Sequence, residues 1–211
     1  HPGIPLVYDV EEDLTNSYLI EEYLEGESLY ALVKRLGSLS MKTAAEIGIQ
    51  VCRLIQFMNT ADNPILYLDL QPKNLLVCNG AVRLIDFDHA QYAEDVTAFG
   101  ERYGTIGFAA PEQYWGEPLD CRTDVYAIGA LLYYMCRGEP PGNGFCLGDR
   151  SDTWELDRII RGCMAAEKDG RYQNAGKVEQ ALCELKTVLS EKHAIESLTI
   201  VFAGARPGIG T

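Results

Sequence analysis

The chain has 211 residues, 47% of them hydrophobic and 23% charged, so it can bury the core of one globular domain and is not expected to be disordered. Eighteen basic against 31 acidic residues give a net charge of −13, which disfavours nucleic-acid binding and attraction to an anionic membrane. The seven cysteines form no Cys-x-x-Cys pair, no apolar run is long enough to cross a bilayer and no signal peptide opens the chain, so we expect reduced thiols and a cytoplasmic location.

Two runs of β-branched and aromatic residues come first, at 4–10 and 17–23, and the acidic turn between them predicts an antiparallel pair of strands. A short helix is expected over residues 28–35. A longer helix should follow Ser40, whose hydroxyl can cap it, because apolar residues then recur at steps of three and four. This apolar stripe indicates a core helix.

Residues 75–78 and 81–85 are short apolar runs, and the Asn-Gly pair between them is typical of a two-residue type I′ turn. If the residues that flank the turn face each other, counting back along both strands places Asn74 opposite Ile85. The sequence therefore predicts a β-hairpin with this register.

Asn74 and Asp86 should consequently emerge at the same end of the hairpin, and Asp69 lies five residues before Asn74. Two carboxylates and one amide, with no His or Cys among them, suit a hard cation such as Mg²⁺, which prefers oxygen ligands. We therefore expect a magnesium site at this end.

The rest of the chain begins with residues 89–103, which have few apolar anchors and are expected to form an irregular loop. A helix that is apolar on almost every face should run from Thr123 to Gly138. Two further helices are expected over 154–165 and 175–189.

The end of the chain has a different pattern. Residues 198–203 form an apolar, strand-like run that leads into the Gly-rich segment 204–211, of the kind that cradles phosphate on backbone N–H groups. This segment resembles the variant Walker loop of ParA/MinD-like partitioning ATPases, and a plain Gly-rich linker is the alternative. We therefore expect the chain to be a piece of a longer protein, with a possible fused P-loop ATPase domain after it.

The hairpin region belongs to a set of motifs in a fixed order. Residues 67–74, Tyr-Leu-Asp-Leu-Gln-Pro-Lys-Asn, are similar to the H-R-D-L-K-P catalytic loop with its Asn; residues 86–88 are similar to D-F-G; and residues 110–112 are A-P-E. Together these motifs resemble the eukaryotic-type protein kinases in their bacterial Ser/Thr form, over residues 1 to about 189.

The resemblance implies an α+β, protein-kinase-like fold. Residues 1–24 would be a remnant of the small lobe and the hinge, 25–190 the helical large lobe, and 191–211 a linker and the start of the possible P-loop domain. The Gly-rich loop over the phosphates and the ATP-anchoring Lys would precede residue 1. We therefore expect this fragment alone to transfer phosphate poorly or not at all.

The resemblance also implies roles for the residues of the site, with ATP and Mg²⁺ as cofactors. Asp69 would accept or orient the proton of the attacking hydroxyl, and Thr105 would bond to Asp69 and favour a Ser/Thr acceptor. Gln71 stands where the family has a Lys that contacts the transferring phosphate. Asn74 and Asp86 would hold the metal.

Other positions would bind the nucleotide or support the site. The backbone of Glu22 and Leu24 would bind the adenine edge, and Leu76 would pack beneath the ring. The supporting residues would be Asp124, which braces the catalytic-loop backbone, and the buried ion pair of Glu112 with Arg171.

Several residues depart from the family pattern. Leu68 replaces the Arg that pairs with a phosphorylated activation loop, and Tyr67 replaces His, which we interpret as an exchange of packing residues. Gln71 replaces Lys and removes a positive charge, for which Lys73 is a candidate to compensate. Asp88 replaces the Gly of D-F-G. Glu21 occupies the usually apolar position at the back of the nucleotide pocket.

Three functions follow. The first is ATP- and Mg²⁺-dependent phosphoryl transfer to Ser or Thr of a protein substrate. The second, supported by Gln71 and Asp88, is a pseudokinase or nucleotide-sensing module that regulates a fused P-loop ATPase. The third is a small-molecule kinase, against which stand Thr105, the A-P-E motif and Arg171.

Overall fold

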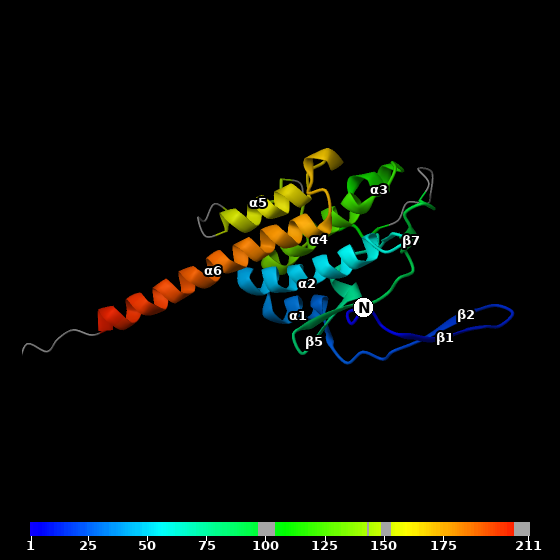
Figure 1. Ribbon diagram of the computed structural model, residues 1–211, viewed down its shortest axis with the longest axis horizontal. Coiled ribbons are helices and arrows are strands. Elements are labelled where there is room, and N and C mark those ends of the chain that lie inside the picture. Colours follow the sequence, from blue (N-terminus) through cyan, green and yellow to red (C-terminus); the bar gives the residue numbers. More distant parts are fainter. Residues whose placement is uncertain (97–103, 143, 149–152, 205–211) are drawn as a thin grey trace, which may run out of the picture.

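The structure is a computed structural model that describes residues 1–96, 104–142, 144–148 and 153–204, with backbone alone for 192–204. Most of the helices form a layered body, and a β-hairpin and the end of the last helix project from it (Figure 1). The α-helices are α1 (Leu29–Leu36), α2 (Met41–Asn59), α3 (Pro111–Trp115), α4 (Cys121–Arg137), α5 (Trp154–Cys163) and α6 (Ala175–Gly204). Two 3₁₀ turns are η1 (Pro72–Asn74) and η2 (Lys168–Gly170).

Helix α4 is the centre of the body. Twelve of its 17 residues are buried, as the apolar pattern on almost every face predicts. It begins at Cys121, two residues earlier than expected, because the Asp120 carboxylate accepts a hydrogen bond of 2.8 Å from the Arg122 N–H and caps the helix there. It ends at Gly138, as expected, in the left-handed conformation.

The two N-terminal helices start where hydroxyl caps were available. Ser28 accepts from the Ala31 N–H at 3.1 Å before α1, and Ser40 accepts from the Thr43 N–H at 3.1 Å before α2. Helix α2 then packs against both α4 and α6. The predicted core role of α2 is therefore confirmed.

The predicted hairpin is formed by β5 (Leu75–Cys78) and β6 (Ala81–Leu84), and β3 (Glu27–Ser28) adds a third strand beside β5. Its register is the expected one. Cys78 faces Ala81, and the Ile85 N–H donates to the Asn74 carbonyl at 3.0 Å. The hairpin therefore fixes the relation between residue 74 and the segment that begins at residue 85.

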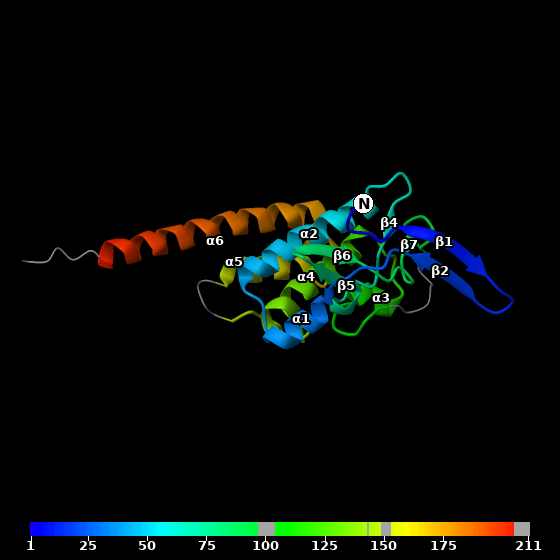
Figure 2. The ribbon, with the colours of Figure 1, turned by 90° about the horizontal axis from the view of Figure 1, so that it is seen from below.

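A second hairpin, β1 (Val7–Glu12) with β2 (Ser17–Glu21), projects from the body and is exposed along its whole length (Figure 2). Its first strand starts later than expected. Residues before it follow the body instead, because the Gly3 carbonyl accepts from the Leu84 N–H at 2.8 Å. The antiparallel pairing itself is confirmed.

Two expectations for the later chain are wrong. Gln91–Tyr92 forms a short strand, β7, which pairs with β4 (Ile65–Leu66), so part of the expected irregular loop is ordered; residues 97–103 lie outside the described part. Residues 198–203 continue α6 as helix and do not form a strand. The Gly-rich tail after Gly204 lies outside the described residues.

The helical course of 198–203 has a simple reason. A short apolar run has no periodicity that separates strand from helix, and no Gly or Pro interrupts the chain between residue 177 and Gly204, so the helix propagates. Among the described helices, none is long and apolar enough to cross a membrane.

Helices α4 and α5 approach closely at Gly129. A Cβ at this position would lie 2.5 Å from the Cβ of Cys163 and 2.7 Å from Cγ of Met164. Gly129→Ala should therefore destabilise the protein by about 1–3 kcal/mol through overpacking, although Ala is the better helix former. Thermal unfolding of the full-length protein checks this, with Gly142→Ala as the control, because a Cβ at Gly142 meets no atom within 4 Å. Equal melting temperatures for both variants would contradict the prediction.

Candidate active site

The catalytic-loop backbone is held by one carboxylate from α4. Asp124, 1% exposed, accepts from the Tyr67 N–H at 3.0 Å and from the Leu68 N–H at 2.9 Å. Burial raises the pKa of the Asp124 carboxyl, and these N–H donors oppose that rise. Leu68 has a φ of 66°, a strained conformation for a non-glycine residue. The contact expected of Asp124 is present.

The side chain of Asp69 is surrounded by three neutral donors. The Thr105 hydroxyl donates to its Oδ1 at 2.7 Å, and the amides of Gln71 and Asn74 each donate to its Oδ2 at 2.8 Å. Asp69 is 8% exposed. The structure thus brings together four of the residues singled out from the sequence, and orients one carboxylate through both of its oxygens.

Asn74 has its amide orientation fixed by the same residue. Its Nδ2 also donates to the main-chain oxygen of Asp69 at 3.0 Å. Both donations use the nitrogen, so Oδ1 of Asn74 is the atom left to face a cation. Asn74 is therefore suited to the metal-ligand role expected of it.

Asp86 lies at the end of the hairpin next to Asn74, with a φ of 64° and an exposed side chain. The buried Tyr67 shares its single O–H between two carbonyl oxygens, that of Ile85 at 2.5 Å and that of Asp86 at 2.9 Å. The Tyr67 ring also packs edge-on against Phe87, with ring centres 5.5 Å apart. Tyr67 therefore holds the backbone that presents Asp86.

Burial, followed by the nearby Asp69 and Asp86 carboxylates, raises the pKa of Tyr67 well above its ordinary value. Its hydroxyl consequently keeps its proton and remains a donor. Sequence reasoning assigned Tyr67 to packing and missed this role. The available signal was the polar tip of a Tyr in an apolar stretch, because a buried Tyr hydroxyl needs a partner.

The candidate compensating cation points elsewhere. The Lys73 ammonium lies over the Tyr30 ring, 5.6 Å from its centre, whereas Gln71 reaches Asp69. The lost positive charge is therefore not replaced by Lys73 in this structure.

The ion pair of Glu112 and Arg171 is present and buried. Arg171 donates from Nη1 to Oε1 at 2.6 Å and from Nη2 to Oε2 at 2.8 Å, and the two residues are 2% and 3% exposed. The Thr123 hydroxyl also donates to Glu112 at 3.0 Å. Burial alone would raise the pKa of Glu112, but the hydrogen bonds, led by that from Arg171, lower it. This bidentate pair joins α3 to the turn before α6.

The expected nucleotide-binding residues occupy the segment between β2 and β3 and the start of β5. The Glu22 N–H already donates to the Leu6 carbonyl at 2.8 Å, so the Glu22 carbonyl is the backbone group left for a ligand. Leu24 and Leu76 are half-buried, and Leu76 pairs with Ser28 across β5 and β3. The adenine-binding roles of Glu22, Leu24 and Leu76 remain predictions.

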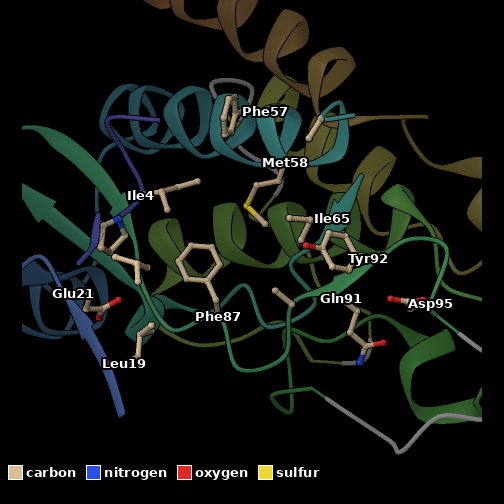
Figure 3. A pocket seen from close by; sticks show the side chains of 14 residues that line it. Ile4, Leu19, Glu21, Phe57, Met58, Ile65, Phe87, Gln91, Tyr92 and Asp95 are labelled. Carbon is tan, nitrogen blue, oxygen red and sulfur yellow. The ribbon is translucent and has the colours of Figure 1, made fainter. Parts of the chain in front are cut away.

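A mainly apolar cavity of about 660 Å³ lies beside Phe87, between the β1–β2 hairpin and the end of α2 (Figure 3). Leu19, Phe57 and Met58 contribute apolar walls, and Glu21 contributes a carboxylate at the edge. The Glu21 carboxylate therefore lies at the edge of an apolar space that Phe87, the residue after Asp86, also lines.

Comparison with known proteins adds a second line of observation. The protein kinase domain family model matches residues 1–200. The serine/threonine-protein kinase PknB of Mycolicibacterium smegmatis is 32% identical over 212 residues, covering 86% of this chain and 33% of the relative. PknB of Mycobacterium tuberculosis is 30% identical over 208 residues, again covering 86% and 33%. The chain thus spans about a third of the length of these relatives.

Removing the Tyr67 hydroxyl tests its bonds to the hairpin end. Tyr67→Phe should lower the free energy of unfolding by about 1 kcal/mol, because the ring stays while two carbonyls lose their donor. Thermal unfolding of the full-length protein measures the change. Tyr114→Phe is the matched control, since the buried Tyr114 hydroxyl has no hydrogen-bond partner among the described residues. A Tyr67 variant as stable as this control would refute the role.

Breaking the buried ion pair from one side tests its energetics. Arg171→Met should destabilise by about 3–5 kcal/mol at pH 7, because it leaves the Glu112 carboxylate buried and unpaired. Thermal unfolding of the full-length protein measures the loss. Arg35→Met is the control, because Arg35 makes a bidentate pair with Glu27 in which both side chains are exposed, so its loss should matter little.

The same variant has a pH signature. In the wild type the pKa of Glu112 is lowered from 4.5, so its stabilisation is present above pH 4.5 and is lost as the pH falls through the lowered pKa. Without Arg171, burial should raise this pKa instead, so the variant loses stability as the pH rises. The stability difference should therefore shrink between pH 7 and pH 4. A constant difference would contradict this account.

Proposed function

Because this chain belongs to the protein kinase family, we propose that it carries the catalytic half of a kinase that transfers phosphate from ATP to Ser or Thr of a protein substrate. The observation that supports this most is the Asp69 carboxylate, oriented by Thr105, Gln71 and Asn74 at 2.7–2.8 Å. Phosphoryl transfer depends mostly on positioning and on charge stabilisation, so an oriented carboxylate suits the reaction.

In this proposal Asp69 accepts or orients the proton of the attacking hydroxyl. Its two oxygens are held in different ways, Oδ1 by the Thr105 hydroxyl and Oδ2 by two amides. Oδ2 already accepts two hydrogen bonds, whereas Oδ1 accepts one and keeps a lone pair for a substrate hydroxyl. The three donors are uncharged, so they orient the carboxylate without placing a positive charge beside it.

Asn74 and Asp86 would hold Mg²⁺. They offer an amide oxygen and a carboxylate, which match the oxygen preference of this ion. A bound Mg²⁺ would neutralise charge on the phosphate oxygens. The chain itself orients both residues. Nδ2 of Asn74 donates to two oxygens of Asp69, and the Tyr67 hydroxyl donates to the carbonyl of Asp86.

A second candidate rests on Gln71, whose amide replaces a Lys and donates to Asp69. A neutral amide offsets the charge that develops on the phosphate less than the ammonium of a Lys does. Losing that ammonium costs on the order of 3 kcal/mol in barrier. A pseudokinase, or a nucleotide-sensing module that regulates a fused P-loop ATPase, would tolerate this loss. The Thr105–Asp69 bond and the Glu112–Arg171 pair favour a protein substrate over a small molecule.

We propose the same division as for the sequence: 1–24 as small-lobe remnant and hinge, 25–190 as large lobe, and 191–211 as linker and start of a possible P-loop domain. The exposed β1–β2 hairpin and the apolar cavity beside it support further small-lobe strands packing there. The Gly-rich loop and the ATP-anchoring Lys would lie on those strands. A cytoplasmic location is part of the proposal.

Replacing the carboxylate tests the proposal. In the full-length protein, Asp69→Asn should lower phosphate transfer from ATP to a generic protein substrate by about a hundredfold or more, while ATP binding persists. Phosphoserine and phosphothreonine formation is measured, with Asp62→Asn as the control because Asp62 is an exposed residue of the turn after α2. Residues 1–211 alone, assayed in the same way, should transfer little or no phosphate.

Equal labelling by the wild type and Asp69→Asn would remove Asp69 from its role. A wild type that binds ATP with Mg²⁺ but labels no protein would favour the pseudokinase. Phosphorylation by residues 1–211 alone would contradict the proposed need for further small-lobe strands.

A further inference from the structure

Gln113 reaches from α3 across to the catalytic loop. Its Nε2 donates to the Leu68 carbonyl at 2.8 Å, and its Oε1 accepts from the Ala110 N–H at 2.9 Å. The side chain is 4% exposed. The nitrogen and the oxygen of the amide both make hydrogen bonds, so the orientation of the amide is fixed.

The bond from Gln113 falls on the peptide unit that leads into Asp69. The carbonyl of this unit, from Leu68, is held by Gln113, and its N–H, from Asp69, donates to the Tyr67 carbonyl at 3.0 Å. The preceding N–H is held by Asp124 at 2.9 Å. Leu68 has a φ of 66°, so these bonds maintain a strained backbone. Among them, the Gln113 bond comes from the segment that also carries Thr105, which bonds to the Asp69 carboxylate.

Residues 104–113 contact the catalytic loop at both ends. Thr105 bonds to the Asp69 carboxylate at one end, and Gln113 bonds to Leu68 at the other. The two ends are also packed together: a Cβ on Gly104, whose φ is 133°, would lie 2.3 Å from the Cβ of Ala109 and 3.2 Å from Nε2 of Gln113. The segment is therefore packed as one unit and contacts the catalytic loop through both bonds.

We propose that Gln113 is a positioning residue that couples the docking of residues 104–113 to the orientation of Asp69. The inference rests on the proposed function, because the orientation of Asp69 matters for phosphoryl transfer. The coupling bond joins a neutral amide to the backbone carbonyl of Leu68, a buried residue that is 2% exposed. Neither partner is charged, so the contact does not depend on a charged group. Gln113 acts through the Leu68 peptide and does not touch the reacting atoms.

Gln113→Glu is the sharpest test because it keeps the shape and removes the donor. The introduced carboxylate can still accept from the Ala110 N–H but repels the Leu68 carbonyl. Burial raises the pKa of such a group, and once protonated it can donate again. We expect kcat of the full-length protein to fall about tenfold at pH 8 with KM changed less than twofold, and the ratio of wild type to variant to approach one by pH 6.

Gln50 offers a matched control. Its Nε2 donates to the Gly80 carbonyl at 3.0 Å and its Oε1 accepts from the Val82 N–H at 3.0 Å, so it makes the same kind of bridge at the turn of the β5–β6 hairpin. Gln50→Glu should lower stability without changing kcat or its pH profile. A Gln113 variant whose loss of kcat does not vary with pH, or is absent, would overturn the proposal.

Amide hydrogen exchange, measured without nucleotide, decides the coupling independently of activity. Gln113→Glu should speed exchange about tenfold at the Leu68 and Asp69 amides, whereas Gln50→Glu should leave exchange at these two amides unchanged. A wild type without kinase activity would refute the proposed function, and the exchange data would still decide the coupling. Unchanged exchange at Leu68 and Asp69 would refute the coupling even in an active enzyme.

Discussion

The catalytic loop depends on two hydrogen bonds that the Asp124 carboxylate accepts from successive backbone N–H groups, those of Tyr67 and Leu68. A buried carboxylate is costly unless donors surround it, and a left-handed non-glycine residue is costly unless neighbours hold it. Each of these costs is offset by the other. The contact is rigid because Asp124 lies in the first turn of the most buried helix, so the packing of α4 sets the path of the loop that carries Asp69.

The site built on this loop is held together by neutral donors. Thr105, Gln71 and Asn74 hold the side chain of Asp69, and Gln113 holds the peptide before it. Dipoles fix the geometry of a carboxylate without cancelling its charge. In the proposed function, charge neutralisation would therefore come from a cation bound by the oxygens of Asn74 and Asp86.

The parts of the fold predicted from sequence were those with a local physical signal. The Asn-Gly turn set the hairpin register, and Ser28 and Ser40 set two helix starts. Motif order brought Asp69, Asn74 and Thr105 together. The errors arose where the decisive partner was distant in sequence or where the pattern was ambiguous. Residues 198–203 fit either a strand or a helix. The roles of Tyr67 and Gln113 depend on backbone carbonyls, and the side-chain pattern shows at most that a buried Tyr hydroxyl needs some partner, without showing which one.

The partners that hold the catalytic loop come from far along the chain. Thr105, Gln113 and Asp124 lie 36, 45 and 57 residues or so beyond the atoms that they bind. Contacts of such sequence separation form late, after the entropy of closing the intervening loops has been paid. A chain emerging from the ribosome therefore holds residues 67–74 without their supports until α4 has left the exit tunnel. The geometry around Asp69 therefore cannot form before α4 is available, and a chain that ends before α4 would have no ordered Asp69.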